Sequence, residues 1–93
     1  MKCSVIITSK NRPKLAEEAI NSVLDQTIKA DEIIFINDNS TIDYDNIEIT
    51  YGNYIIYIKT TSNLGGPGAR NLGASLANND VLMFLDDDDL WER

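Results

Sequence analysis

The sequence predicts an α/β domain in which a mostly parallel sheet is flanked by helices. Four short segments are apolar at successive positions and rich in β-branched side chains, which is typical of strands that are buried on both faces. Two of the segments between them have apolar residues at helical spacing, which indicates helices packed on the sheet. The 93 residues are enough for one such domain with a modest core.

The first part of the chain predicts a strand, a helix and a second strand. The first strand is expected at residues 3–8, where no polar alternation interrupts the apolar run. Pro13 favours a helix start, because its fixed φ suits the first turn, and we expect this helix to end near Gln26. A second strand is expected at residues 33–36, before the turn-forming residues 37–41. The apolar stripe of the helix consists of Leu15, Ala16, Ala19, Ile20, Val23 and Leu24.

The second part of the chain repeats this alternation after an irregular segment. Residues 42–53 are polar and acidic without clear periodicity, and we interpret them as a loop. A third strand is expected at residues 54–59, followed by a glycine-rich turn at residues 63–68 in which Pro67 can begin a helix. The fourth strand is expected at residues 81–85. The inner face of the second helix is predicted to consist of Ala69, Leu72, Gly73, Leu76 and Ala77.

The fourth predicted strand leads directly into four consecutive aspartates, residues 86–89. Carboxylates this close repel one another unless a positive charge lies between them. Mg²⁺ and Mn²⁺ prefer oxygen ligands, and Mg²⁺ is often held by one or two carboxylates together with substrate phosphates. The junction therefore indicates a metal site with a phosphorylated ligand, although a solvated acidic stretch is the alternative.

Composition excludes several classes of protein. With 15 acidic and 8 basic residues, the chain does not suit a nucleic-acid backbone as its partner. The single cysteine, Cys3, cannot form an internal disulfide, which favours a cytoplasmic location. No histidine is present to activate that thiol. No apolar run approaches the roughly 20 residues that a membrane-spanning helix needs.

Polar residues follow each predicted strand at its carboxyl end, where parallel α/β sheets bind their ligands. The first strand is followed by residues that include Arg12, and the second by Asp38, so one crevice could gather a cation, a carboxylate and a metal site. The turn after the first strand has no glycine, which excludes the dinucleotide fingerprint there, and the lysine of a P-loop is missing after Gly68. An EF-hand fails because Ile47 stands where a ligand is required.

Six sequence blocks in order resemble the nucleotide-binding half of family 2 glycosyltransferases, which have the GT-A fold. The resemblance covers essentially all 93 residues, and its specificity comes from the succession of blocks rather than from any one of them. The blocks are VIIT with NRP (residues 5–8 and 11–13), SVLDQT (22–27), INDNST (36–41), NLG (63–65), ARNLG (69–73) and FLDDDDLW (84–91).

The resemblance implies transfer of a sugar from a nucleoside diphosphate sugar, usually with inversion, assisted by Mn²⁺ or Mg²⁺. The family's D-x-D motif corresponds to residues 86–88. Asp88 would be the main metal ligand, with Asp86 as a second one. Asp86 and Asp87 would also contact the ribose or metal-bound water. Asp38 would accept a hydrogen bond from the base, which is uracil if the donor is a uridine nucleotide. The nucleotide-binding residues implied in this way are Thr8, Asn11, Arg12, Asp38, Arg70, Asp86 and Asp87.

Each of these roles has a simpler alternative. Thr8 could be strand or turn material, and Arg12 and Arg70 could be solvent-facing cations. Asp89 could cap a following turn, and Trp91 is expected in a core. Where family members often have two aspartates after the second strand, this chain has Asn37 followed by Asp38, so only the second carboxylate remains.

The general base of inverting members comes from the part of the domain after the D-x-D motif, so we expect it beyond Arg93. Residues 1–93 are therefore expected to be the donor-binding part of a longer glycosyltransferase domain, itself inactive and able to self-associate through the fourth strand. A glycan or lipid-linked acceptor is expected, with peripheral membrane association as an alternative location for the whole protein. A non-catalytic nucleotide- or metal-binding module and an acidic interaction domain remain alternative functions.

Overall fold

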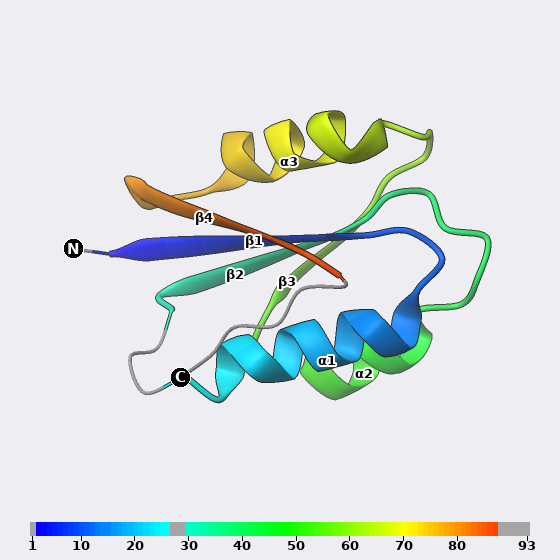
Figure 1. The fold of residues 1–93 in the computed structure, drawn as a ribbon, viewed down its shortest axis with the longest axis horizontal. Coiled ribbons are helices and arrows are strands. Elements are labelled where there is room, and N and C mark those ends of the chain that lie inside the picture. The colour runs from blue at the N-terminus through cyan, green and yellow to red at the C-terminus, as the bar shows by residue number, and fades with distance from the viewer. Residues whose placement is uncertain (1, 27–29, 88–93) are drawn as a thin grey trace.

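The computed structural model describes residues 2–26 and 30–87. Within them, strands and helices alternate along the chain, as the sequence predicts (Figure 1). The elements in chain order are β1 (Cys3–Ser9), α1 (Pro13–Leu24), β2 (Glu32–Asn37), α2 (Asp45–Tyr51), β3 (Ile56–Lys59), α3 (Gly65–Leu76) and β4 (Val81–Asp86).

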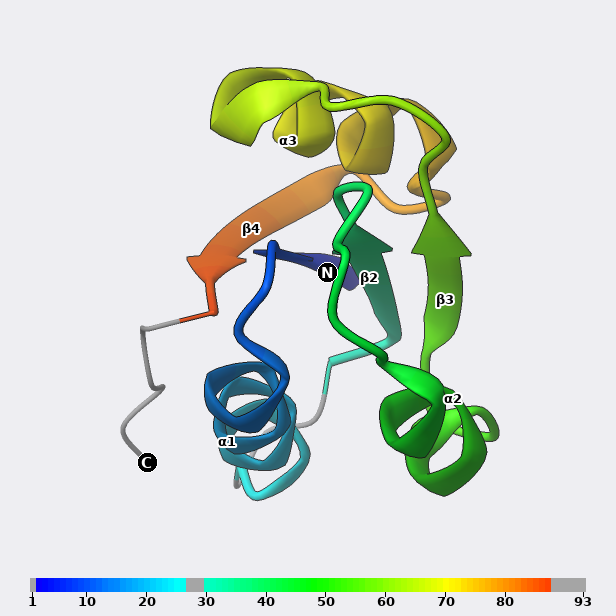
Figure 2. The same ribbon diagram turned by 90° about the vertical axis from the view of Figure 1, so that its right-hand side faces the viewer.

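The strands form one sheet in the order β3-β2-β1-β4, and every pair is parallel. Helices α1 and α2 cover one face of this sheet and α3 covers the other (Figure 2). The chain therefore builds the sheet outward from β1 to β3 and then crosses by α3 to the opposite side of β1. This reversal creates a topological switch point between β1 and β4, which is the usual place for a ligand in such a sheet.

Two apolar layers hold the helices on the sheet. Val5 and Ile7 of β1 face α1 and α2, whereas Ile6 faces α3, because successive side chains of a strand point to opposite faces. On the α3 side, Gly73 lies so close to β1 that a Cβ built on it would overlap with Cγ2 of Ile6. The small residues predicted on the inner face of this helix therefore allow the close approach that the structure shows.

The prediction of a loop at residues 42–53 is wrong, because α2 lies there. This helix has only seven residues, and its β-branched Ile47, Ile49 and Thr50 weaken the local helical signal. Its stability comes from the burial of Ile47, which is 1% exposed, and of the preceding Tyr44, which is 3% exposed. Tertiary packing therefore selects a helix that the local pattern does not reveal.

Two other boundaries differ from the sequence prediction. Strand β3 begins at Ile56 rather than at residue 54, because the backbone N–H groups of Tyr54 and Ile55 donate to the carbonyl of Tyr51 at the end of α2. Helix α3 begins at Gly65 rather than at Pro67. Within residues 2–26 and 30–87, no helix has the length and apolar character needed to cross a membrane.

Candidate functional site

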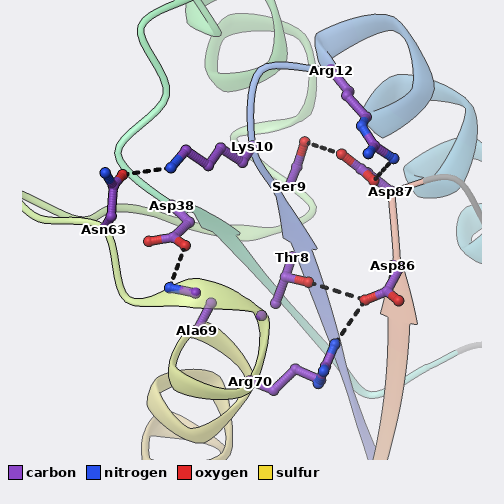
Figure 3. A pocket seen from close by; sticks show the side chains of 12 residues that line it. Thr8, Ser9, Lys10, Arg12, Asp38, Asn63, Ala69, Arg70, Asp86 and Asp87 are labelled. Carbon is purple, nitrogen blue, oxygen red and sulfur yellow. Dashed lines mark hydrogen bonds and ion pairs between the residues drawn. The ribbon is translucent and has the colours of Figure 1, made fainter.

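The parallel register brings the carboxyl ends of the strands together at one edge of the sheet. Thr8 of β1 is paired with Asp86 of β4, and Ser9 is paired with Asn37 of β2. The loop after β1 and the amino end of α3 reach over the same edge (Figure 3). As predicted, the polar residues that follow the strands therefore converge at the switch point between β1 and β4.

These residues surround an open pocket of about 390 Å³. Its lining combines three cationic and three acidic side chains with hydroxyl, amide and backbone groups. A polar pocket with both signs of charge suits a ligand that carries negative charge and hydrogen-bonding groups. The lining residues are Thr8, Ser9, Lys10, Arg12, Asp38, Asn63, Gly65, Gly66, Ala69, Arg70, Asp86 and Asp87.

Asp38 is buried at one side of the pocket, where it holds the beginning of α3. Its carboxylate accepts hydrogen bonds from the backbone N–H groups of Leu64 at 2.8 Å and Gly65 at 3.0 Å. The Thr60 hydroxyl donates to it as well, at 3.3 Å. The two backbone bonds give N–H groups at the beginning of α3 a side-chain acceptor, which explains why α3 begins two residues before Pro67.

Asp86 lies at the end of β4 between Thr8 and Arg70. Oδ1 of Asp86 accepts a hydrogen bond from the Thr8 hydroxyl at 3.4 Å and forms an ion pair with Nη1 of Arg70 at 3.0 Å. The side chains of Arg70 and Asp86 are 35% and 51% exposed, so the pair is open to water and to a ligand. Three residues that were predicted separately to contact a nucleotide are therefore adjacent in the pocket.

Asp87 is held much more tightly than Asp86. Its side chain is 8% exposed, and Oδ2 accepts a hydrogen bond from the Ser9 hydroxyl at 2.8 Å. Nη1 of Arg12 lies 3.5 Å from Oδ1, and the Arg12 side chain is half exposed. The buried carboxylate of Asp87 therefore joins the end of β4 to the loop after β1.

Asn11 differs from the other predicted site residues, because it does not line the pocket. Its side-chain oxygen accepts hydrogen bonds from the backbone N–H groups of Thr41 at 2.8 Å and Ile42 at 3.2 Å. Its φ of 57° lies in the left-handed region, which asparagine tolerates better than most residues. In this structure the Asn11 side chain fixes the loop after β2, and its predicted contact with a nucleotide stays a prediction.

Asn37 is also committed to the protein itself. Its side chain accepts the Ser40 N–H at 3.1 Å and donates to the Tyr57 hydroxyl at 3.0 Å. Burial raises the pKa of Tyr57, so this hydroxyl stays neutral and can accept the bond. An asparagine at this position therefore supports the turn that carries Asp38.

Ser9, Lys10 and Asn63 also belong to the site, although they were not predicted as site residues. The structure joins two of them across the pocket, where Nζ of Lys10 donates to the side-chain oxygen of Asn63 at 2.7 Å. Their position directly after predicted strands was the only signal in the sequence. Gly65, Gly66 and Ala69 line the pocket through the start of α3, which the prediction placed two residues too late.

The carboxylates at the end of β4 suit a hard divalent cation, because they supply oxygen ligands next to cationic groups that can hold phosphates. In residues 2–26 and 30–87, no group of three or more His, Cys, Asp or Glu side chains could hold a metal without further ligands. Asp86 is exposed and adjacent to the pocket, so it fits as one ligand of a cation that also binds phosphate. The predicted ligand Asp88, together with Asp89 and Trp91, lies outside the described residues.

Cys3 lies at the opposite end of β1 from the pocket. Burial raises the pKa of its thiol, and the negative charge of Asp31 raises it further. A raised pKa disfavours the reactive thiolate. The structure therefore agrees with the interpretation that this cysteine is not a nucleophile.

Comparison with protein families and curated proteins identifies relatives along nearly the whole chain. Residues 4–93 match the family model described as glycosyl transferase family 2. The Escherichia coli protein UDP-Glc:alpha-D-GlcNAc-diphosphoundecaprenol beta-1,3-glucosyltransferase WfaP is 38% identical over 89 residues, which are 95% of this chain and 36% of WfaP. The poly(ribitol-phosphate) beta-glucosyltransferase of Bacillus spizizenii is 35% identical in an alignment 95 positions long, which covers 96% of this chain and 15% of that enzyme. The chain therefore spans well under half the length of these relatives.

Solved structures with a similar fold include Staphylococcus aureus TarS. Residues 1–349 of TarS superpose with a TM-score of 0.83 at 32% identity, covering 97% of this chain and 28% of that one. The same part of TarS in complex with UDP-GlcNAc gives a TM-score of 0.80 at 30% identity, covering 95% of this chain and 27% of that one. The predicted fold class, a parallel sheet with flanking helices as in the nucleotide-binding half of a GT-A fold, is confirmed.

Proposed function

The chain belongs to glycosyl transferase family 2, and we propose that it forms the donor-binding part of an enzyme that transfers a sugar from a uridine diphosphate sugar. The observation that carries this proposal is the pocket at the switch point, which brings Thr8, Asp38, Arg70 and Asp86 to one cavity. TarS, which resembles the chain at 30% identity or above, has been solved with UDP and with UDP-GlcNAc. These likenesses support a uridine nucleotide as the donor.

In this proposal the base lies beside Asp38. A carboxylate offers about four lone-pair positions. The backbone N–H groups of Leu64 and Gly65 occupy two of them on Asp38, and the single hydroxyl proton of Thr60 lies within reach of both Asp38, at 3.3 Å, and the carbonyl of Ser62, at 3.0 Å. One further N–H donor can therefore be accommodated. Uracil has an N3–H group at its Watson–Crick edge that can donate there.

The diphosphate lies toward Arg70, Arg12 and the end of β4, where cationic side chains and carboxylates alternate. When bound, Mn²⁺ or Mg²⁺ would offset the negative charge that develops on the leaving diphosphate. Asp86 and Asp88 would hold the ion. The guanidinium of Arg70 keeps Asp86 oriented toward the pocket and can itself bind a phosphate oxygen.

The proposal for the whole protein also includes the acceptor of the sugar and the stereochemistry of the transfer. We expect transfer with inversion to a glycan acceptor, with the general base supplied from outside residues 1–93. Names of relatives include enzymes for diphosphoundecaprenol-linked acceptors and for poly(ribitol-phosphate), which supports a lipid-linked or polymeric glycan. In this proposal the 93-residue chain alone binds the donor and does not transfer the sugar.

Calorimetric titration of the chain with UDP, with and without Mn²⁺, tests this function. We expect Mn²⁺ to increase the affinity for UDP, because the phosphates complete a coordination shell that the aspartates begin. Asp88→Asn should abolish this increase. Asp80→Asn is a matched control, because Asp80 is exposed and precedes the opposite end of β4. Equal affinities for UDP in both conditions would remove the metal from the proposal, and no binding of UDP would remove the donor site itself.

A further inference from the structure

A closed circuit of hydrogen bonds connects a buried tyrosine, which lies outside the pocket, to the acidic side of the pocket. The hydroxyl of Tyr44 lies 2.6 Å from the hydroxyl of Ser9, and both groups are buried. The backbone N–H of Arg12 donates to the same tyrosine oxygen at 2.9 Å. Ser9 then donates to Asp87, whose other oxygen lies 3.5 Å from the Arg12 side chain.

The direction of every hydrogen bond in this circuit follows from the chemistry of Asp87. An ionised carboxylate can only accept, so the Ser9 hydroxyl must give its single proton to Asp87. Ser9 must therefore accept from Tyr44, and Tyr44 must accept from the N–H of Arg12. Each hydroxyl donates once and accepts once, which lets successive bonds strengthen one another.

The circuit binds the chain at Asp87, where the backbone pairing of the sheet has ended. Strand β4 ends at Asp86, which is paired with Thr8, so Asp87 is the first residue beyond the strand. In Figure 3, Asp87 meets Ser9 and Arg12, while Asp86 turns toward Thr8 and Arg70. Because Ser9 and Arg12 hold the Asp87 carboxylate, they determine where the chain leaves β4, next to the Asp86 carboxylate that lines the pocket.

We propose that Tyr44 is a positioning residue of the donor site: its hydroxyl orients Ser9 and Arg12, which fix Asp87 and with it the metal-binding end of β4. This inference rests on the proposed function, because it concerns the same site. Tyr44 itself does not line the pocket, and its ring packs against Phe35 with centroids 6.1 Å apart. Only its hydroxyl takes part in the circuit, so the role is separable from the packing of the ring.

Tyr44→Phe tests this role, because it keeps the buried ring and removes the hydroxyl. We expect the affinity for UDP in Mn²⁺ to fall about three- to tenfold, the effect of one or two lost hydrogen bonds. Without Mn²⁺ the loss should be smaller, because the metal site then makes no contribution and only the proposed contact of Arg12 with the diphosphate is affected. Tyr51→Phe is the matched control, because its hydroxyl donates to Asn21 at 2.9 Å, away from the pocket. It should leave both affinities unchanged.

A double-mutant cycle with Ser9→Ala separates positioning from a general loss of stability. If Tyr44 acts partly through Ser9, then Tyr44→Phe should have a smaller effect on UDP affinity once Ser9 is alanine, because only the bond with the Arg12 N–H is then left to lose. Circular dichroism shows whether each variant is folded. If Tyr44→Phe does not fold, the effect of Ser9→Ala on UDP affinity tests the circuit instead. Unchanged UDP affinity in folded Tyr44→Phe, an equal loss with and without Mn²⁺, or additive effects of the two substitutions would each overturn the inference. Absence of UDP binding by the unaltered chain would instead overturn the proposed function.

Discussion

Asp38 shows how one side chain can serve both the fold and a ligand. Its carboxylate binds the backbone N–H groups of Leu64 and Gly65 and so determines where α3 begins. The same side chain lines the pocket. The start of α3 and the proposed base site therefore share one carboxylate, and a change at Asp38 should affect both.

We expect Asp38→Ala to lower UDP affinity by roughly 1–3 kcal/mol, the usual cost of losing a hydrogen bond to a charged group. It should also lower the free energy of unfolding, because two backbone N–H groups at the beginning of α3 lose their acceptor. Titration calorimetry and chemical denaturation measure these effects, and Thr60→Val is the control that removes a donor but keeps the carboxylate. An unaltered UDP affinity would leave Asp38 with a structural role alone.

Among the elements, α3 depends most on a close approach to the sheet. It crosses from β3 to β4 over the face formed by Ile6 and its neighbours, and Gly73 provides the space. The position of α3 in turn places Arg70 opposite Asp86. The packing of a glycine in the helix therefore contributes to the geometry of the pocket one turn away.

Gly73→Ala should destabilise the chain by about 1–2 kcal/mol. The added Cβ would clash with the β-branched Ile6, and this strain exceeds the gain in helix propensity. Gly66→Ala in the first turn is a matched control, because its Cβ would meet only the end of the Arg70 side chain at 3.4 Å. Urea denaturation compares the two variants. Equal stability of Gly73→Ala and the unaltered chain would show that α3 can move away from β1 without cost.

At the scale of the whole molecule, a second polar cluster joins the elements at the amino end of the sheet. Glu32 of β2 accepts hydrogen bonds from the Ser4 hydroxyl of β1 at 2.8 Å and from the backbone N–H of Asn78 at 2.9 Å. The side chain of Asn78 donates to it as well, at 2.7 Å. These bonds, the one from the Asn78 backbone above all, hold the pKa of Glu32 below its usual value.

Stability should therefore depend on pH through Glu32. Because the folded pKa is lower than the unfolded value of about 4.3, the contribution is complete above that value and is lost as the pH falls through the folded pKa. Glu32→Gln should cost about 1 kcal/mol at pH 7, and the difference from the unaltered chain should shrink toward pH 3. Denaturation at several pH values measures this difference in the free energy of unfolding. Glu18→Gln is the control, because Glu18 is an exposed residue of α1. A difference that stays constant with pH would contradict the assignment.

The described sheet also leaves β4 at its edge, paired only with β1. Met83 and Phe84 on this strand are 43% and 47% exposed, so both backbone and apolar side chains are open to another chain. We expect the 93-residue chain to self-associate there, and light scattering at several concentrations should show a dimer or larger species. Phe84→Lys should weaken the association, whereas Tyr54→Lys, at a 64% exposed aromatic residue after α2, should not. A monomer at all concentrations would show that this edge does not pair.

The alternation of strands and helices, and the edge of the sheet at which the site lies, follow from the amino-acid sequence alone. Buried parallel strands have continuous apolar runs, and the polar residues after them must meet at one edge, so the sequence is enough to assign Asp38 and Asp86 to one crevice. Other features follow only from contacts between distant segments in the folded chain: the helix after Tyr44, the early start of α3, the commitment of Asn11 to a loop and the circuit through Ser9. Local sequence patterns do not show these features, because each depends on partners at least 26 residues away along the chain.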